Sequence, residues 1–151
     1  MNFLWDTNIL IHYIRSSDLY QKLDQQHSFF QIPNRTFISV VSVGEIFSIA
    51  KQRGWKTAKL NALNEILKDL RPLPIAQQSI IEAYADIDAY SQGKHSSFIL
   101  PKNMSARNMG KNDLWIAATT TVTESKLITT DNDFDHLDGE YFDVIKIKII
   151  K

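Results

Sequence analysis

Apolar residues along the chain recur at two different spacings, which separate predicted strands from predicted helices. Short runs of apolar and β-branched residues predict strands at residues 3–5, 37–43, 126–130 and 144–150. Residues 73–75 are expected to form a very short edge strand, because proline is tolerated at the edge of a sheet. Apolar positions three or four residues apart predict helices at 9–14, 18–26, 45–54, 57–70, 79–92 and 113–125, the last capped by Asn112.

Strands and helices alternate along most of the chain, and this order indicates the fold class. Strand-helix-strand units of this length form parallel sheets with helices on both faces. We therefore expect an α/β fold with a mostly parallel central sheet of about five strands in a three-layer α/β/α arrangement. A length of 151 residues suits one domain with a substantial core, so residues 1–151 are expected to form a single domain.

The composition is that of an ordinary globular protein and excludes several kinds of site. Hydrophobic residues make up 44% of the chain and charged residues 23%. The absence of cysteine excludes a disulfide scaffold, thiol catalysis and thiolate-bound zinc, so oxygen or imidazole must hold any metal ion. The histidines are not paired at metal-ligand spacing. No apolar stretch is long enough to span a bilayer and no signal-peptide pattern is present, so we expect a cytoplasmic protein.

Basic and acidic residues are balanced, with 17 of each, so no overall field draws a polyanion toward the chain. A local basic rim can still bind nucleic acid when acids elsewhere cancel its charge. Two candidate rims are present: Lys51, Arg53, Lys56 and Lys59, and then Lys94, His95, Lys102, Arg107 and Lys111. Arg107 and Lys111 shortly precede Asp113 and are the candidates for phosphate contacts in RNA binding.

Four acidic residues lie where predicted strands end or the adjoining helices begin. Asp6 follows the first strand, and Glu45 lies in the first turns of the helix after the second. Asp113 opens a later helix, and Asp131 follows the strand at 126–130. Each acid alone is explained by helix capping, the helix dipole or turn formation. A parallel sheet, however, gathers its strand ends at one edge, so we expect these carboxylates to converge.

Converging carboxylates predict a particular chemistry. They repel one another and raise each other's pKa values unless a cation neutralises them. The ion that suits clustered oxygen ligands is Mg²⁺, with Mn²⁺ as the alternative. Such an ion lowers the pKa of a bound water and stabilises the charge that builds on a phosphorus centre under attack. The acids therefore predict metal-dependent hydrolysis of a phosphodiester.

The stretches that carry these acids resemble the successive motifs of one family. FLWDTNIL, SVVSVGEIFSIAKQRG, GKNDLWIAATT and LITTDNDF are similar, in order and spacing, to motifs of PIN-domain ribonucleases, especially the VapC-type toxins of bacterial toxin-antitoxin pairs. The resemblance implies a Mg²⁺-dependent endoribonuclease that cleaves single-stranded or structured RNA, forms a homodimer and is blocked by an antitoxin protein. It implies that the catalytic metal site consists of Asp6, Glu45, Asp113 and Asp131.

The resemblance also assigns supporting roles and leaves some positions open. Asn8, and the hydroxyl of Thr7 or Thr130, match family positions that orient the carboxylates around the metal. In the sequence DND, Asp133 is a rival to Asp131 as the fourth acid. The polar segment 94–112 is longer than expected for a minimal member of the family, which leaves the substrate contacts open.

Two other functions are compatible with parts of the pattern. A strand that ends in Asp6 also begins haloacid-dehalogenase-type phosphatases, which use that Asp as a nucleophile. Those enzymes need a second acid two residues later as proton donor, and this chain has Asn8 there, whose amide cannot supply the proton. A PIN-like module that binds RNA or protein without cleavage would be favoured if an acid were replaced, and all four are present.

Overall fold

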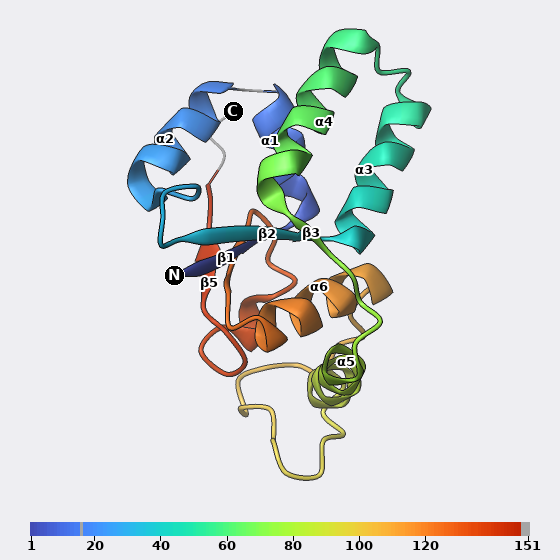
Figure 1. The fold of residues 1–151 in the computed structure, drawn as a ribbon. Coiled ribbons are helices and arrows are strands. Elements are labelled where there is room, and N and C mark those ends of the chain that lie inside the picture. Colours follow the sequence, from blue (N-terminus) through green and yellow to red (C-terminus); the bar gives the residue numbers. More distant parts are fainter. Residues whose placement is uncertain (16, 149–151) are drawn as a thin grey trace.

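A parallel five-stranded sheet forms the centre of the protein, as a computed structural model of residues 1–15 and 17–148 shows. The strands are β1 (Asn2–Trp5), β2 (Arg35–Ser39), β3 (Pro72–Leu73), β4 (Lys126–Thr129) and β5 (Val144–Lys146). They pair in the order β3-β2-β1-β4-β5, and every pair is parallel. β1 therefore lies in the middle of the sheet, beside β4 from the far end of the sequence (Figure 1).

Helices cover both faces of the sheet, which confirms the predicted three-layer α/β/α fold (Figure 1). One face carries α1 (Thr7–Arg15), α2 (Ser17–His27), α3 (Val40–Gln52) and α4 (Thr57–Leu70). The other face carries α5 (Gln78–Ser91) and α6 (Lys111–Val122), and the short 3-10 helix η1 (Asp135–Leu137) follows β4. Within the described residues, no helix combines the length and the apolar character that crossing a bilayer requires.

The alternation of side chains along β1 explains why both faces are covered. Phe3 and Trp5 pack into the hydrophobic cluster beneath α1 to α4, whereas Leu4 packs into the cluster beneath α5 and α6. None of the three is more than 1% exposed. Full burial of a large apolar side chain contributes about 1.5–3 kcal/mol. The central strand is therefore held from both sides, and its carboxyl end is fixed in place.

The starts of α3 and α6 differ from the prediction, and at α3 a local contact decides. Residues 40–43 begin α3 instead of extending β2, because Ser39 caps the helix by accepting a hydrogen bond from Val41 N–H at 3.1 Å. The cap outweighs the β propensity of the valines. α6 begins at Lys111 with Gly110 at its N-cap, so Asn112 lies inside the helix instead of capping it.

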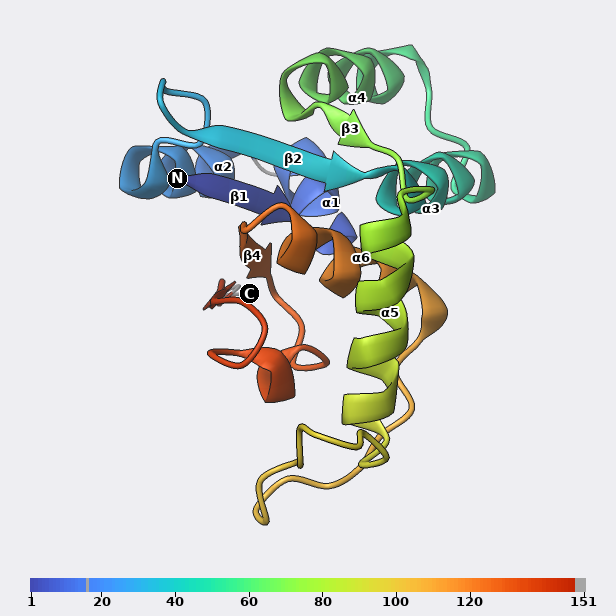
Figure 2. The same ribbon diagram turned by 60° about the horizontal axis from the view of Figure 1, so that its bottom comes forward.

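The edge strands are shorter than the sequence predicts. β3 consists of Pro72–Leu73 and not of residues 73–75. The predicted strand 144–150 ends at Lys146, and its residues 149 and 150 lie outside the described part of the chain. The segment between α5 and α6 projects away from the sheet (Figure 2).

Candidate active site

Asp6 directly follows β1 and is buried at the carboxyl end of the sheet, with 4% of its surface exposed. Both of its carboxylate oxygens accept hydrogen bonds: Thr7 N–H donates to Oδ1 at 2.8 Å, and the Thr129 hydroxyl donates to Oδ2 at 2.7 Å. These bonds favour the ionised form. Burial nevertheless raises the pKa of Asp6 to about 6, with smaller contributions from the charges of Asp131 and Glu45.

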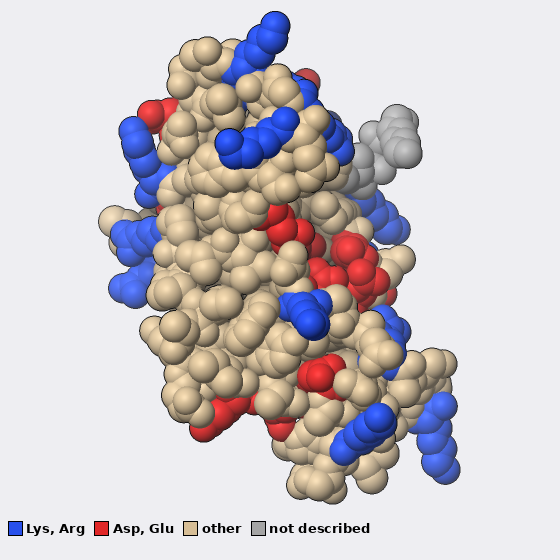
Figure 3. Space-filling view, turned by 90° about the vertical axis from the view of Figure 1, so that its right-hand side faces the viewer, with Lys and Arg blue, Asp and Glu red and all other residues tan. Residues whose placement is uncertain are grey.

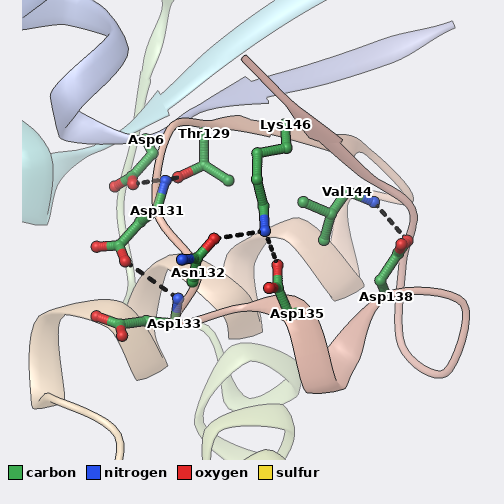
Figure 4. A network of polar contacts seen from close by, with 9 residues as sticks. All are labelled: Asp6, Thr129, Asp131, Asn132, Asp133, Asp135, Asp138, Val144 and Lys146. Carbon is green, nitrogen blue, oxygen red and sulfur yellow. Dashed lines mark hydrogen bonds and ion pairs between the residues drawn. The ribbon is translucent and has the colours of Figure 1, made fainter. Parts of the chain in front are cut away.

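Thr129 reaches Asp6 because β4 is the neighbour of β1 in the sheet. The register pairs Trp5 with Ile128, so Asp6 and Thr129 come next on the two strands, side by side. The Thr129 hydroxyl oxygen also accepts a hydrogen bond from Asp131 N–H at 3.0 Å (Figure 4). One hydroxyl group therefore orients the acid after β1 and the acid after β4.

Glu45 on α3 is connected to the same site through Thr7. The Thr7 hydroxyl lies 3.0 Å from Glu45 Oε1 and 2.8 Å from the Ser42 hydroxyl. A groove of about 560 Å³ lies beside Glu45, lined by α3 residues and by Asn112 of α6. The carboxylate of Glu45 is therefore part of the wall of an open groove at the edge of the site.

Asp113, the third residue of α6, is partly buried, and its pKa is raised to about 7. Burial is the largest cause, followed by the negative charges of Asp6, Asp133, Asp131 and Glu45. The helix dipole typically stabilises a carboxylate in the first turn by about 0.3–1 kcal/mol. Here burial and repulsion by the other acids outweigh the stabilisation by the helix dipole. The repulsion shows that the five acids lie within electrostatic range of one another.

Three of these carboxylates approach one another most closely. Asp113, Asp131 and Asp133 each offer an oxygen within 4.8 Å of the others. Asp133 N–H donates to Asp131 Oδ1 at 3.1 Å, which folds the DND sequence into a turn (Figure 4). Burial and the charge of Asp131 raise the pKa of Asp133 as well. Asp133 therefore lies beside Asp131 in the same turn.

This arrangement fits a hard divalent cation. Oxygens around a Mg²⁺ ion lie about 3–4 Å apart, given metal–oxygen bonds of about 2.1 Å. Small side-chain rotations would therefore bring the oxygens of Asp113, Asp131 and Asp133 onto one ion. Burial and the neighbouring carboxylates raise the pKa values of Asp6 and Asp113, and a bound cation would counteract both effects.

Lys146 on β5 contacts the acidic turn, which is formed by residues 131–135 after β4 (Figure 4). Its ammonium group donates a hydrogen bond to Asn132 Oδ1 at 2.7 Å and forms an ion pair with Asp135. These contacts join the chain after β4 to the edge strand of the sheet. They limit how far Asp131 and Asp133 can move.

Acidic side chains gather on one face of the molecule, with separate basic side chains around them (Figure 3). The chain as a whole has no net charge. Its charges are therefore distributed unevenly, and this face with gathered acids attracts cations.

The structure places the predicted site residues as follows. Asp6, Asp113 and Asp131 come together, and Glu45 adjoins them within electrostatic range. The Thr7 hydroxyl donates to Glu45, and the hydroxyl that donates to Asp6 belongs to Thr129 and not to Thr130. Within the described residues, the Asn8 side chain makes no hydrogen bond, and Lys111 is exposed at the start of α6. Arg107 lies near enough to lower the pKa of Asp133.

Sequence reasoning missed three contributors: Thr129, Ser42 and Lys146. The strand register that pairs Trp5 with Ile128 would have identified Thr129, but register is a property of the folded sheet. Ser42 and Lys146 carry no motif, since each acts only through a tertiary contact.

Comparison with known proteins shows the family to which this chain belongs. The sequence model of the PIN domain matches residues 3–140, and the chain belongs to the PIN domain family. PIN domains are typically nucleases. A comparison with curated proteins finds no match.

Solved structures with a similar fold include toxin-antitoxin complexes. VapBC2 from Rickettsia felis, bound to a promoter DNA fragment, gives a TM-score of 0.77 at 18% identity, over 97% of this chain and 98% of that chain. VapBC-1 from nontypeable Haemophilus influenzae gives 0.68 at 20% identity, over 97% and 98%. VapBC-5 from Mycobacterium tuberculosis gives 0.62 at 22% identity, over 97% and 98%. At these identities the likeness concerns the fold.

Proposed function

We propose that this chain is a Mg²⁺-dependent endoribonuclease, acting as the toxin of a type II toxin-antitoxin pair. The observation that carries the proposal is the meeting of Asp113, Asp131 and Asp133 oxygens within 4.8 Å, beside the buried Asp6. This donor set suits Mg²⁺ or Mn²⁺. Membership of the PIN family and the amide of Asn8, where a phosphatase needs an acid, favour the nuclease over the phosphatase.

In this proposal Asp113, Asp131 and Asp133 hold the ion, and Asp6 and Glu45 complete its negative surroundings. A bound ion of this kind supplies a water of lowered pKa and stabilises charge on the attacked phosphorus. Thr129 and Thr7 N–H keep Asp6 oriented by their hydrogen bonds. Because Asp6 and Asp113 have raised pKa values, they must release protons before a cation binds.

The proposal extends to substrate, partners and location. RNA would enter along the groove beside Glu45, where the chain is open to solvent. The expected antitoxin partner is supported by the toxin-antitoxin complexes among the structural neighbours, and the proposal includes a homodimer as its assembly. We place this activity in the cytoplasm and in one domain that spans residues 1–151.

The direct test is cleavage of an end-labelled single-stranded RNA by the purified chain, with Mg²⁺, with Mn²⁺ and with EDTA. Asp6→Asn and Asp113→Asn should each lower the rate by at least about 100-fold, beyond the 10- to 100-fold typical of losing an outer-shell partner. Asp69→Asn, an exposed acid on α4, is the matched control and should cleave normally. Cleavage that survives in EDTA or in both site variants would refute the proposal, and a trapped phospho-aspartate at Asp6 would indicate the phosphatase instead.

A further inference from the structure

The segment between α5 and α6 is fastened to the body of the protein where it begins. His95 Nδ1 accepts hydrogen bonds from the N–H groups of Ser97 and Phe98, both at 3.0 Å, while Nε2 contacts Asp86 on α5. The Tyr141 hydroxyl donates to the other oxygen of Asp86 at 2.8 Å. Every polar atom of the imidazole is engaged, so the start of the segment has a defined conformation.

A second anchor holds the segment before it enters α6. Arg107 N–H donates to the carbonyl oxygen of Ser91 at 2.8 Å, at the end of α5. The Ser91 hydroxyl lies 2.7 Å from His136 Nε2 in η1 and 3.3 Å from Met109 Sδ. Arg107 is therefore fixed beside the end of α5 through its main chain, independently of its guanidinium group.

A pocket of about 240 Å³ lies between these anchors, lined by Gln92, Lys94, Ala106, Arg107 and Asn108. Two cations and two amides line it, and no acid does. Across the described residues, Lys94 and Arg107 take part in no salt bridge. With a water occupying about 30 Å³, the pocket has room for a phosphate group and several waters. The Gln92 amide donates one N–H to Asp88 Oδ1 at 2.9 Å and keeps a second, so both cations and both amides can donate to an anion.

The pocket adjoins the acidic site. Arg107 N–H donates to the Ser91 carbonyl oxygen, and the Ser91 hydroxyl contacts His136 in η1. η1 directly follows the turn that carries Asp131 and Asp133, and Arg107 shortly precedes Asp113 in the sequence. The basic pocket and the carboxylate cluster are therefore neighbours.

We infer that Lys94 and Arg107, with Gln92 and Asn108, bind a backbone phosphate of the polynucleotide next to the phosphate that is cleaved. This inference rests on the proposed nuclease function and adds a substrate contact to it. An acidic cluster repels a polyanion, so a cationic pocket beside it supplies the attraction that the neutral chain lacks. A guanidinium group can donate two parallel hydrogen bonds to the oxygens of one phosphate, and amide groups add further N–H donors of fixed direction.

The test uses the full chain carrying Asp6→Asn, so that the probe is not consumed. Binding of a fluorescent single-stranded oligoribonucleotide is followed by anisotropy over a range of salt concentrations. Arg107→Ala and Lys94→Ala should each weaken binding about 10-fold and reduce the slope of log Kd against log salt by about 0.7, the value for one phosphate contact on a single strand. Lys22→Ala, an exposed cation on α2 and outside the pocket, is the control and should change neither quantity.

Unchanged affinity and slope in both Arg107→Ala and Lys94→Ala, with melting temperatures equal to the parent, would overturn the inference. Inorganic phosphate is the second probe, and we expect it to compete only far above the oligonucleotide Kd. Phosphate binding as tight as oligonucleotide binding would identify a site for free phosphate and would also overturn it. Failure of the proposed function would be seen in a different measurement. The wild-type chain would then cleave no RNA, irrespective of the salt dependence of binding.

Discussion

The Thr129 hydroxyl donates a 2.7 Å hydrogen bond to Oδ2 of Asp6 and so connects two positions 123 residues apart in the sequence. The contact exists because β1 and β4 are adjacent and in a register that aligns their carboxyl ends. The same hydroxyl accepts from Asp131 N–H at 3.0 Å. It therefore couples the buried acid of the site to the turn that carries the more exposed acids.

Thr129→Val removes this hydroxyl at nearly constant volume. We expect the pKa of Asp6 to rise above its present value of about 6, because a hydrogen bond that favours the ionised form is lost. Mn²⁺ affinity at pH 7, measured by titration calorimetry, should fall about 10-fold, as for other outer-shell partners. Thr129→Ser should recover most of it. Thr130→Val is the matched control, and an equal loss in that variant would show that Thr129 has no special role.

Asp6 should destabilise the metal-free protein at neutral pH. The pKa of Asp6 is about 6 in the folded state and about 3.9 in the unfolded state. Between these two pH values the folded state therefore binds more protons than the unfolded state. The contribution of Asp6 to stability therefore decreases as pH rises from about 4 to about 6, by up to about 3 kcal/mol. Urea unfolding in EDTA should find Asp6→Asn more stable than wild type at pH 8 and similar to it at pH 4. A variant less stable than wild type at pH 8 would contradict this.

Metal affinity should depend on pH through the two acids with the largest shifts. The pKa values of Asp6 and Asp113 are raised to about 6 and about 7, and both groups must lose their protons for a cation to bind. Affinity for Mn²⁺ should therefore increase from pH 5 to pH 8 and then level off. Asp113→Asn should bind Mn²⁺ more weakly and with a shallower pH dependence. Affinity that is constant across this range would exclude protonated carboxyl groups from the site.

Lys146→Met tests whether the ammonium group positions the acidic turn. The ion pair with Asp135 is partly exposed, with side-chain exposures of 33% and 47%, so its loss should cost less than about 1 kcal/mol of stability. Mn²⁺ affinity should nevertheless fall severalfold, because the turn holding Asp131 and Asp133 is released from β5. Lys146→Arg should retain the affinity, and Lys148→Met, an exposed neighbour, should have no effect. Equally weaker binding in both methionine variants would contradict a specific role for Lys146, whereas a general charge effect would make both variants bind Mn²⁺ more tightly.

The sequence carries enough information to predict the fold class and the meeting of the acids. Asp6 and Asp131 follow the apolar strands β1 and β4 closely in the sequence, and the ends of parallel strands lie at one edge of a sheet. The orienting hydroxyl could not be assigned, because Thr129 and Thr130 differ only in strand register, which the packed sheet determines. The boundary after Ser39 was wrong for a similar reason, since a single cap hydrogen bond decides between strand and helix.

The conformation of residues 94–110 could not be predicted from the sequence, for a different reason. This segment has no periodic pattern, and its conformation depends on contacts such as that of His95 with Asp86 on α5 and of Arg107 with Ser91. Contacts of this kind are set only after the helices have packed. The basic pocket therefore becomes visible only in the folded protein, although Arg107 itself could be selected from its place before Asp113.

The most direct measurement is anomalous diffraction from crystals of the wild-type chain soaked with Mn²⁺. We expect a manganese peak between the carboxylates of Asp113, Asp131 and Asp133, with metal–oxygen distances of about 2.1–2.2 Å, close to those of Mg²⁺ sites. A saturating soak that leaves these carboxylates without a peak, or places the ion away from them, would contradict the proposed metal site.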